Sequence, residues 1–270
     1  MIIECNKNST LLEYMYEVIK DRSKNNIKSL LKNGVYVNDK LVTQYDYELK
    51  KGDKLRFIIN KIGDISILYE DNEFIVIEKP HNMLTIATSK EKEKTVYHTL
   101  LTYLKRKNQK IFILHRLDKE TSGIMIFCKN EKIRDLMQNN WKDVKRKYVA
   151  IVKGKINDSG VYKDYLDENK IHKVYISKEG KLAITKYKKI KESNRFSLVD
   201  IEIITGRKNQ IRVQMAEHGN YILGDNKYSD DYKKYGRLYL HATEISFKHP
   251  IKKKIMKFVS PIPNNFDKIL

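Results

Sequence analysis

The stretch "HRLDKETSG", residues 115–123, places a histidine, an arginine and an aspartate within four residues and continues into a Thr-Ser-Gly turn. The apolar run "IMIFC" follows at 124–128 and is typical of a buried strand. Asp118 is therefore predicted to be a loop carboxylate at a sheet edge, where it can act as nucleophile or general base. The alternative is a carboxylate that only caps the turn, by accepting hydrogen bonds from backbone amides near Thr121.

The same stretch contains the residue types of a serine hydrolase, namely His115, Asp118 and Ser122. Catalytic triads draw their members from separate segments, so that three side chains can converge on one point. Here all three residues belong to one short loop. A hydrolase triad is therefore not expected.

Strand-like segments dominate the chain around this loop, and short helices separate them. The strand-like segments include "GIMIFCKN", "KYVAIVKG", "LAITKYKKI" and "SLVDIEIIT". Helices are predicted over 95–105, 132–138 and 209–217. Because hairpins are more frequent here than regular strand-helix-strand units, we expect an α+β fold on a mixed, mostly antiparallel sheet.

The first 60 residues form a pattern of their own. Its predicted elements are a helix over 11–19, a second helix over 24–32, a hairpin at 35–42 and a strand within 49–59. The second helix ends at Asn33-Gly34, a common stop signal, and the hairpin turns at Asn38-Asp39. Two helices followed by "GVYVND" and "KKGD" resemble the alpha-L RNA-binding motif.

Basic residues cluster around the junction of these two predicted helices. They are Lys20, Arg22, Lys24, Lys28 and Lys32. Such a cluster fits an RNA phosphate backbone, and a solvated charged face is the alternative. The resemblance implies an RNA-binding domain at 1–60, and a connector is expected at 61–66 before a larger domain at 67–270.

Composition points to nucleic acid as the partner class. Lys and Arg outnumber Asp and Glu by 54 to 34, which gives a formal net charge of +20. A phosphate backbone would complement this charge. The excess consists mostly of lysine in a chain also rich in Asn and Ile, so genome composition is the competing explanation.

The sequence offers no sign of secretion, disulfides or a membrane span. The two cysteines, Cys5 and Cys128, are far apart and lack the spacing of a zinc site. The amino terminus "MIIECNKNST" lacks the features of a secretory signal, and the longest apolar runs are only strand-length. We therefore expect a cytoplasmic protein.

The stretch at 115–123 resembles the signature of the RluA-type family of RNA pseudouridine synthases, in which HRLD, two variable residues and TSG carry the catalytic aspartate. Other segments resemble further family motifs in the same order. They are "VIEKPHNML" at 76–84, "KYVAIVKG" at 147–154, "TGRKNQIRVQMAEHGNYILGDNKY" at 205–228 and "LYLHATEISFKHP" at 238–250.

This resemblance implies a reaction and the residues that perform it. Uracil is detached from its ribose, rotated and rejoined through carbon 5, which requires no cofactor and no metal. Asp118 would be the catalytic carboxylate, Arg212 its positive partner, and Tyr148 the aromatic face for uracil, whose hydroxyl can take part in removing the proton from carbon 5. A buried aspartate needs a cation to stay ionised, and Arg207 is the other candidate.

Further residues are expected to contact the substrate. Arg116 would fill the space left by the extruded nucleotide, and Lys79 and Ile211 would line the pocket. His115 either braces the loop or touches the substrate. Two positions depart from the family pattern, because Asn209 and Gln214 stand where histidines are usual. Neither position contacts the catalytic carboxylate in the family, so both departures are expected to affect fine positioning or target choice.

The sequence therefore predicts an RNA pseudouridine synthase, most simply one that modifies large-subunit ribosomal RNA, with transfer RNA as the other substrate. A monomer is expected. The alternative is a non-catalytic RNA-binding or ribosome-assembly protein that retains the fold. The presence of Asp118, Tyr148 and Arg212 favours the enzyme.

Overall fold

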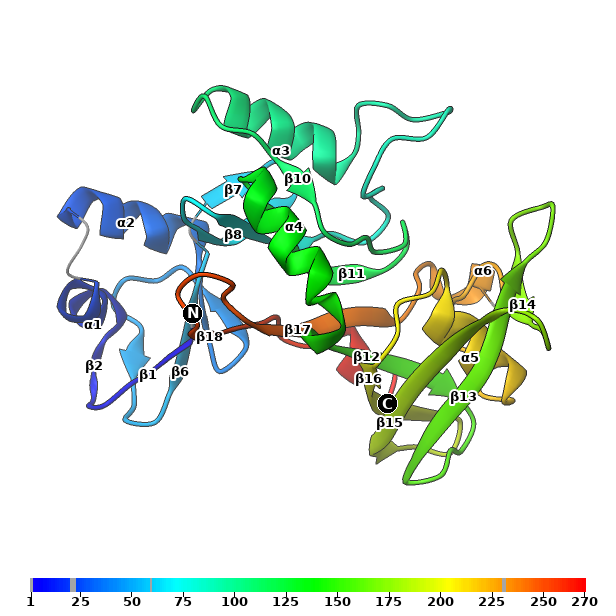
Figure 1. Ribbon diagram of the computed structural model, residues 1–270. Helices are drawn as coiled ribbons and strands as arrows, with labels where there is room; N and C mark the ends of the chain where they lie inside the picture. Colours follow the sequence, from blue (N-terminus) through cyan, green and yellow to red (C-terminus); the bar gives the residue numbers. More distant parts are fainter. Residues whose placement is uncertain (1, 20–22, 59, 230–231) are drawn as a thin grey trace.

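A small N-terminal module lies beside one end of a large twisted sheet in the computed structural model, which describes residues 2–19, 23–58, 60–229 and 232–270 (Figure 1). The helices are α1 (Leu11–Val18), α2 (Lys24–Asn33), α3 (Val96–Lys105), α4 (Glu131–Asn139), α5 (Gln210–Glu217), α6 (Tyr232–Tyr235) and α7 (Asn264–Asp267), with a 3-10 turn at Trp141–Asp143. Each helix predicted from the sequence is present, with ends that differ by one residue.

The N-terminal module has its own sheet and its own core. Its strands are β1 (Ile2–Glu4), β2 (Ser9–Thr10), β3 (Val35–Val37), β4 (Lys40–Val42), β5 (Glu48–Leu49) and β6 (Lys54–Phe57), of which four form a sheet in the order β1-β6-β3-β4. Asn38 and Asp39 have φ angles of +46° and +67°, the left-handed values that a two-residue hairpin turn requires. The predicted hairpin is therefore confirmed.

A 12-stranded sheet forms the rest of the molecule. Its strands are β7 (Asn60–Ile62), β8 (Ile65–Glu70), β9 (Phe74–Lys79), β10 (Phe112–Ile113), β11 (Ser122–Cys128), β12 (Lys145–Lys153), β13 (Ser159–Glu168), β14 (Val174–Ile176), β15 (Lys181–Glu192), β16 (Phe196–Ile203), β17 (Leu240–Lys248) and β18 (Ile255–Val259). The order is β14-β13-β15-β16-β12-β17-β11-β9-β8-β7, with β10 beside β11 and β18 beside β17. Among the described residues β11 and β17 are the one parallel pair, which confirms the mixed, mostly antiparallel sheet.

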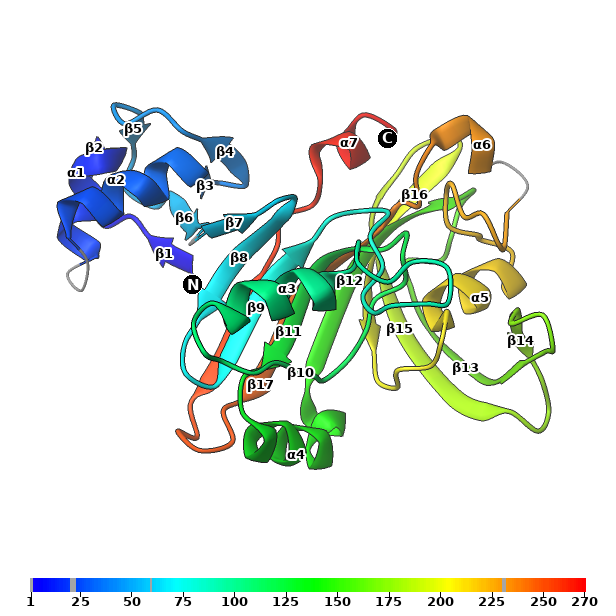
Figure 2. The ribbon, with the colours of Figure 1, turned by 90° about the horizontal axis from the view of Figure 1, so that it is seen from above.

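Helices cover both faces of this sheet, so its central strands are buried on both sides (Figure 2). Along β12, Tyr148 and Ala150 belong to the same core cluster as α3 and α5, whereas Val149 and Ile151 pack with Phe266 of α7 on the opposite face. Helix α4 adds its own cluster on that second face, beside β11. This two-sided burial explains why the strands "IMIFC" and "YVAIV" are continuously apolar.

The expected connector at 61–66 is instead part of the sheet. Strand β7 pairs with β8 through Asn60↔Ile67 and Ile62↔Ile65, so the chain enters the sheet directly from the module. Arg56 of β6 also forms an ion pair with Glu78 of β9, at 3.3 Å. The segment "NKIGD" is short and polar and contains a glycine, so the sequence favoured a connector. Its strand character comes from pairing with β8, which follows it directly. In the part of the chain that the structure describes, no helix has the length and apolar character needed to cross a bilayer.

Candidate active site

The loop that carries Asp118 connects β10 to β11 and is held by side chains from another segment. Thr85 donates from Oγ1 to the carbonyl of Leu117 at 2.7 Å, and the Leu117 amide donates back to Oγ1 at 3.3 Å. Lys79 Nζ donates to the carbonyl of Lys119 at 3.0 Å. The backbone on both sides of Asp118 is therefore fixed before any substrate arrives.

The Thr-Ser-Gly turn brings two sequence motifs into one row of the sheet. Gly123 pairs with Ala242 of β17, and Ala242 pairs in turn with Tyr148 of β12. Gly123 has φ +117°, and a Cβ there would come within 2.2 Å of the Ala242 carbonyl oxygen. Only glycine allows this close parallel pairing. The turn thus sets Asp118 just before the start of β11, and only β17 separates that strand from Tyr148 on β12.

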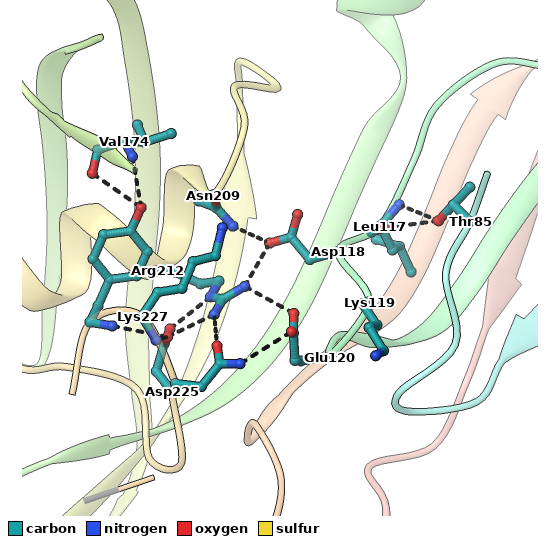
Figure 3. Close-up of polar contacts among 12 residues, drawn as sticks. Thr85, Leu117, Asp118, Lys119, Glu120, Val174, Asn209, Arg212, Asp225 and Lys227 are labelled. Carbon is teal, nitrogen blue, oxygen red and sulfur yellow. Dashed lines mark hydrogen bonds and ion pairs between the residues drawn. The ribbon is translucent and has the colours of Figure 1, made fainter. Parts of the chain in front are cut away.

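One oxygen of the Asp118 carboxylate is held by two side chains from the start of α5. Oδ2 accepts a hydrogen bond from Asn209 Nδ2 at 2.7 Å and another from Arg212 Nη1 at 3.2 Å (Figure 3). No described residue donates to Oδ1, and the side chain is 24% exposed. The loop, the cation and the amide therefore fix the carboxylate in one orientation and leave its second oxygen open.

Arg212 is 1% exposed and makes five hydrogen bonds to acceptors from two segments, the loop at 118–120 and the pair at 225–226. Nε and Nη2 form a two-pronged pair with Asp225, each at 2.7 Å, and Nη2 also donates to Asn226 at 3.0 Å. Nη1 is shared between Asp118 and Glu120, each at 3.2 Å. Burial alone would lower the pKa of Arg212, but its bonds to Asp225 and the nearby carboxylates raise that pKa above its usual value.

A cavity of about 310 Å³ opens beside Asp118. Tyr148, Ile211 and Arg212 line it, together with apolar residues such as Ile203 and Leu240. Burial raises the pKa of the Tyr148 hydroxyl to about 12, against the opposing effect of Arg146, so the hydroxyl is protonated at neutral pH. The cavity combines an aromatic face, an apolar floor and an oriented carboxylate, a combination that suits a flat, neutral heterocycle.

The residues expected to contact the substrate take different places. Arg116 and Arg207 are exposed and line the cavity, and the Arg207 Nε donates to the Leu182 carbonyl at 2.9 Å. His115 also lines it, but its Nε2 accepts from the Ile126 amide at 3.1 Å and its ring packs on Trp141. Burial lowers the pKa of His115 to about 3, so it braces the loop as a neutral ring.

Lys79 does not line the cavity, contrary to the expectation from the sequence. It is fully buried, and its Nζ donates to the carbonyls of Pro80, Met83 and Lys119 at 2.7 to 3.0 Å. Burial lowers the pKa of Lys79 to about 7, partly offset by Glu120 and Asp118. Its place behind the loop that carries Asp118 follows from its position at the end of β9, which pairs with β11 through Lys79↔Gly123.

The two departures from the family pattern have unequal consequences. Asn209, in a left-handed conformation at φ +51°, begins α5 and donates directly to Asp118. The expectation that neither residue contacts the Asp118 carboxylate was wrong for Asn209, because it is one of the two groups that orient that carboxylate. Gln214 lies one turn further, bonded to Thr185 and Asp164 at 2.7 Å each, and supports the packing of α5 on the sheet.

The sequence did not single out Glu120, Asp225 or Arg146. Asp225 is 0% exposed and lies in the "LGDNKY" part of the third motif, so its place in that motif was a signal that could have been used. Glu120 occupies a variable position of the signature, and Arg146 precedes Tyr148 by two residues. For Glu120 and Arg146 the folded chain alone reveals a place in the site, since Glu120 pairs with Arg212 and Arg146 lines the cavity.

The alternatives raised by the sequence can now be compared with the geometry. Ser122 Oγ lies 2.8 Å from His241 Nδ1 rather than near His115, so no triad forms in the loop. The turn is closed by the Asp118 carbonyl, which accepts from the Thr121 amide at 3.2 Å, while the side chain points to Asn209 and Arg212. The carboxylate is therefore not a turn cap.

One group of possible metal ligands lies elsewhere, at Asp71, Glu73 and His249. His249 Nδ1 accepts from the amides of Ile251 and Lys252 at 3.2 and 3.1 Å, which places the ring proton on Nε2, the nitrogen that faces Glu73. Lys252 already neutralises Glu73 at 3.0 Å. This group is therefore a hydrogen-bonded ion cluster whose histidine presents a proton rather than a lone pair.

The predicted RNA-binding cluster is partly described. Lys24, Lys28 and Lys32 are exposed and follow one another at four-residue intervals on α2, so they share one face of the helix. Lys20 and Arg22 lie outside the described residues.

Comparisons with known proteins identify related enzymes. Residues 73–217 match the RNA pseudouridylate synthase family. Ribosomal large subunit pseudouridine synthase D of Buchnera aphidicola subsp. Acyrthosiphon pisum is 30% identical over 284 residues, which cover 94% of this chain and 91% of the relative. Synthase C of Rickettsia bellii is 32% identical over 253 residues, 87% of this chain and 81% of the relative. The structure of human RNA pseudouridylate synthase domain containing 4 superposes with a TM-score of 0.61 at 26% identity, over 74% of this chain and 90% of that chain.

The sheet, the oriented loop carboxylate and these matches define an enzyme that modifies RNA. The chain belongs to the RNA pseudouridylate synthase family. It is accordingly an isomerase that converts uridine in RNA to pseudouridine, and the enzymatic reading of the sequence is confirmed.

Proposed function

We propose that this enzyme isomerises uridine in large-subunit ribosomal RNA and that Asp118 carries the reaction. The observation behind the assignment is the fixed carboxylate, with Oδ2 held by Asn209 and Arg212 and Oδ1 open beside the cavity. The relatives named as ribosomal large subunit synthases C and D support the choice of RNA. Transfer RNA is the competing substrate.

In the proposed mechanism, the target uridine leaves its stack and enters the cavity, where Tyr148 supplies a stacking face. Extrusion costs a few kcal/mol, which contacts inside the cavity and to the flanking phosphates must offset. Arg116 and Arg207, exposed at the opening, are suited to hold the flanking RNA backbone. Ile211 completes the apolar surface against the base.

The chemical step begins with Asp118 ionised beside Arg212. Oδ1 attacks the ribose or the base, or it stabilises the positive charge that develops on the ribose as the glycosidic bond breaks. The base then turns and bonds through carbon 5, whose proton must leave. Because the Tyr148 hydroxyl stays protonated at neutral pH, it can relay this proton only by giving up its own, and the regenerated Asp118 carboxylate is the acceptor in the same cavity.

The N-terminal module is proposed to add RNA affinity that does not depend on sequence. The exposed lysines of α2 and the overall charge of +20 support this role. We further propose that the protein acts as a monomer in the cytoplasm, where ribosomal RNA is available.

A pseudouridine map of total RNA tests the proposal, in cells that lack the protein and are complemented with the parent or with Asp118→Asn. The amide keeps the shape and the hydrogen-bond acceptor but cannot act as an anion, so the modification should disappear while RNA binding persists. Asp135→Asn, which changes an exposed carboxylate on α4, is the control and should restore the map. A site in transfer RNA alone would contradict the ribosomal assignment, and a full map with Asp118→Asn would contradict the catalytic one.

A further inference from the structure

Arg146 is a buried cation without a carboxylate partner in the described chain. Arg146 is 6% exposed, and its one hydrogen bond within the described chain runs from Nη2 to the Ile204 carbonyl at 3.2 Å. Nε is buried with no acceptor. Burial lowers the pKa of Arg146, and only Tyr148 opposes that effect. Arg212, in contrast, is surrounded by three carboxylates.

The position of Arg146 connects it to the reaction chamber. It lies two residues before Tyr148 on β12, so both side chains project from the same face of the strand, and both line the cavity beside Asp118. Gly206 makes room for it, because a Cβ there would come within 2.8 Å of Arg146 Nη1. The guanidinium also lies 5.7 Å from the centre of the Trp141 ring.

A buried and uncompensated charge is expensive, and replacing it with an apolar group of similar size commonly costs nothing or stabilises the fold. A residue kept at such a cost is a candidate for binding an anion that is present only during the reaction. Two observations therefore point to a ligand: the unpaired guanidinium, and the open cavity that Arg146 lines together with Tyr148 and Asp118.

The family reaction produces such an anion. When the bond between C1′ of ribose and N1 of uracil breaks, its electron pair stays with the base, and the negative charge spreads over N1, O2 and O4. Forming the bond between C1′ and C5 and losing the C5 proton then restores a neutral base, with N1 taking up a proton. Atoms and electrons balance without any additional reactant.

We propose that Arg146 receives a carbonyl oxygen of the extruded uracil and stabilises the negative charge on the detached base. This inference rests on the proposed function. A backbone phosphate is the less suitable ligand, because Arg116, Arg207 and Lys208 are exposed at the opening while Arg146 lies deep beside Tyr148. Asp118 and Arg146 thus act on opposite partners of the breaking bond, the ribose and the base.

The test compares Arg146→Met and Arg146→Lys with Lys147→Met, which removes the neighbouring cation from the other face of β12, outside the cavity. Single-turnover rates and RNA affinities are measured for each. We expect Arg146→Met to lower the single-turnover rate about 100-fold, the usual effect of losing one preorganised donor, with RNA affinity changed less than about 3-fold. Arg146→Lys should recover part of the rate, and Lys147→Met should match the parent.

Sulfur-substituted substrates identify the contact. RNA with 2-thiouridine or 4-thiouridine at the target carries a weaker acceptor at one carbonyl position. In the parent enzyme, sulfur at one of the two carbonyl positions should lower the rate, because the contact with Arg146 is weakened. In Arg146→Met this part of the sulfur effect should vanish, since the sulfur in the RNA and the methionine in the protein remove the same interaction. The cycle cancels the intrinsic effect of sulfur on the leaving base.

A stability measurement separates this role from a structural one. The thermal midpoint of Arg146→Met should equal or exceed that of the parent, because an unpaired buried charge is removed. Three outcomes would overturn the proposal. The first is a lower thermal midpoint with a parallel loss of rate, and the second is sulfur effects of equal size in parent and variant. The third is a loss of RNA affinity with a smaller salt dependence. Parental turnover by Arg146→Met would refute Arg146 alone, whereas absence of pseudouridine with the parent enzyme would refute the proposed function itself.

Discussion

Arg212→Met should separate two tasks that this residue performs. The substitution removes five hydrogen bonds and leaves the carboxylate of Asp225, 0% exposed, with the amides of Lys227 and Tyr228 as its only donors among the described residues. Breaking a buried pair from one side costs about 3 to 5 kcal/mol. For a chain of this length, that loss corresponds to a decrease of roughly 6 to 20 °C in the thermal midpoint.

The double variant Arg212→Met/Asp225→Leu removes the stranded charge together with its partner. We expect it to recover most of the lost stability, because an apolar pair of similar volume often replaces a buried ion pair without cost. Turnover should not recover, because Asp118 still lacks the cation that orients Oδ2. Arg212→Lys keeps the charge but not the planar fork, so it should bind RNA normally and react slowly.

Thermal unfolding and single-turnover rates on the same preparations provide the assay. Turnover that returns together with stability in the double variant would mean that Arg212 acts only as a structural tie to Asp225. An Arg212→Met protein that unfolds within a few degrees of the parent would refute the reasoning about burial. Binding of RNA by each variant serves as the control for a folded N-terminal module.

Two further predictions concern residues outside the cavity. Lys79→Met should destabilise the loop that carries Asp118. Because the pKa of Lys79 is lowered to about 7, the folded protein binds fewer protons than the unfolded chain above that pH. The contribution of Lys79 to the unfolding free energy should therefore increase by about 1.4 kcal/mol per pH unit from pH 7 towards 10. A difference between parent and variant that is constant over this range would mean that the lysine titrates normally. Replacing the three α2 lysines with alanine should lower the slope of log affinity against log salt by about 2 to 3 without affecting single-turnover chemistry, and an unchanged slope would place the RNA elsewhere. The changed residues are Lys24, Lys28 and Lys32, and the control set on other surfaces of the module is Lys40, Lys50 and Lys51.

Much of the architecture could be predicted because it depends on local patterns. The end of α2 followed from the stop signal Asn33-Gly34, and the hairpin followed from Asn38-Asp39, since turn chemistry acts over a few residues. The parallel contact between β11 and β17 could not be read in this way, because its partners are 119 residues apart. The prediction of a connector at 61–66 failed for a different reason: the segment is short and polar, and its strand character comes from pairing with β8.

The residues of the candidate site could be predicted from motifs, but their long-range partners could not. Asp118, Tyr148 and Arg212 were predicted because each lies within a motif, and the fold brings them together through the row Gly123–Ala242–Tyr148 and the helix that follows β16. Motifs name residues but not their partners. The sequence assigned Arg212 to Asp118 alone, whereas the guanidinium is anchored first by Asp225, thirteen residues further along the chain.

The two arginines show why charge balance has to be read from the folded chain. In sequence, Arg146 stands two residues before Tyr148 and Arg212 is itself a predicted catalytic residue, and nothing distinguishes a compensated cation from an uncompensated one. In the structure Arg212 is matched by three carboxylates, so its task is to hold an anion that is always present. Arg146 has none, and a buried charge without a partner is stable only if other parts of the fold outweigh its cost. The same low-dielectric cavity that makes Arg146 costly in the empty enzyme would make its attraction for a departing uracil anion strong, because the attraction grows as water is excluded.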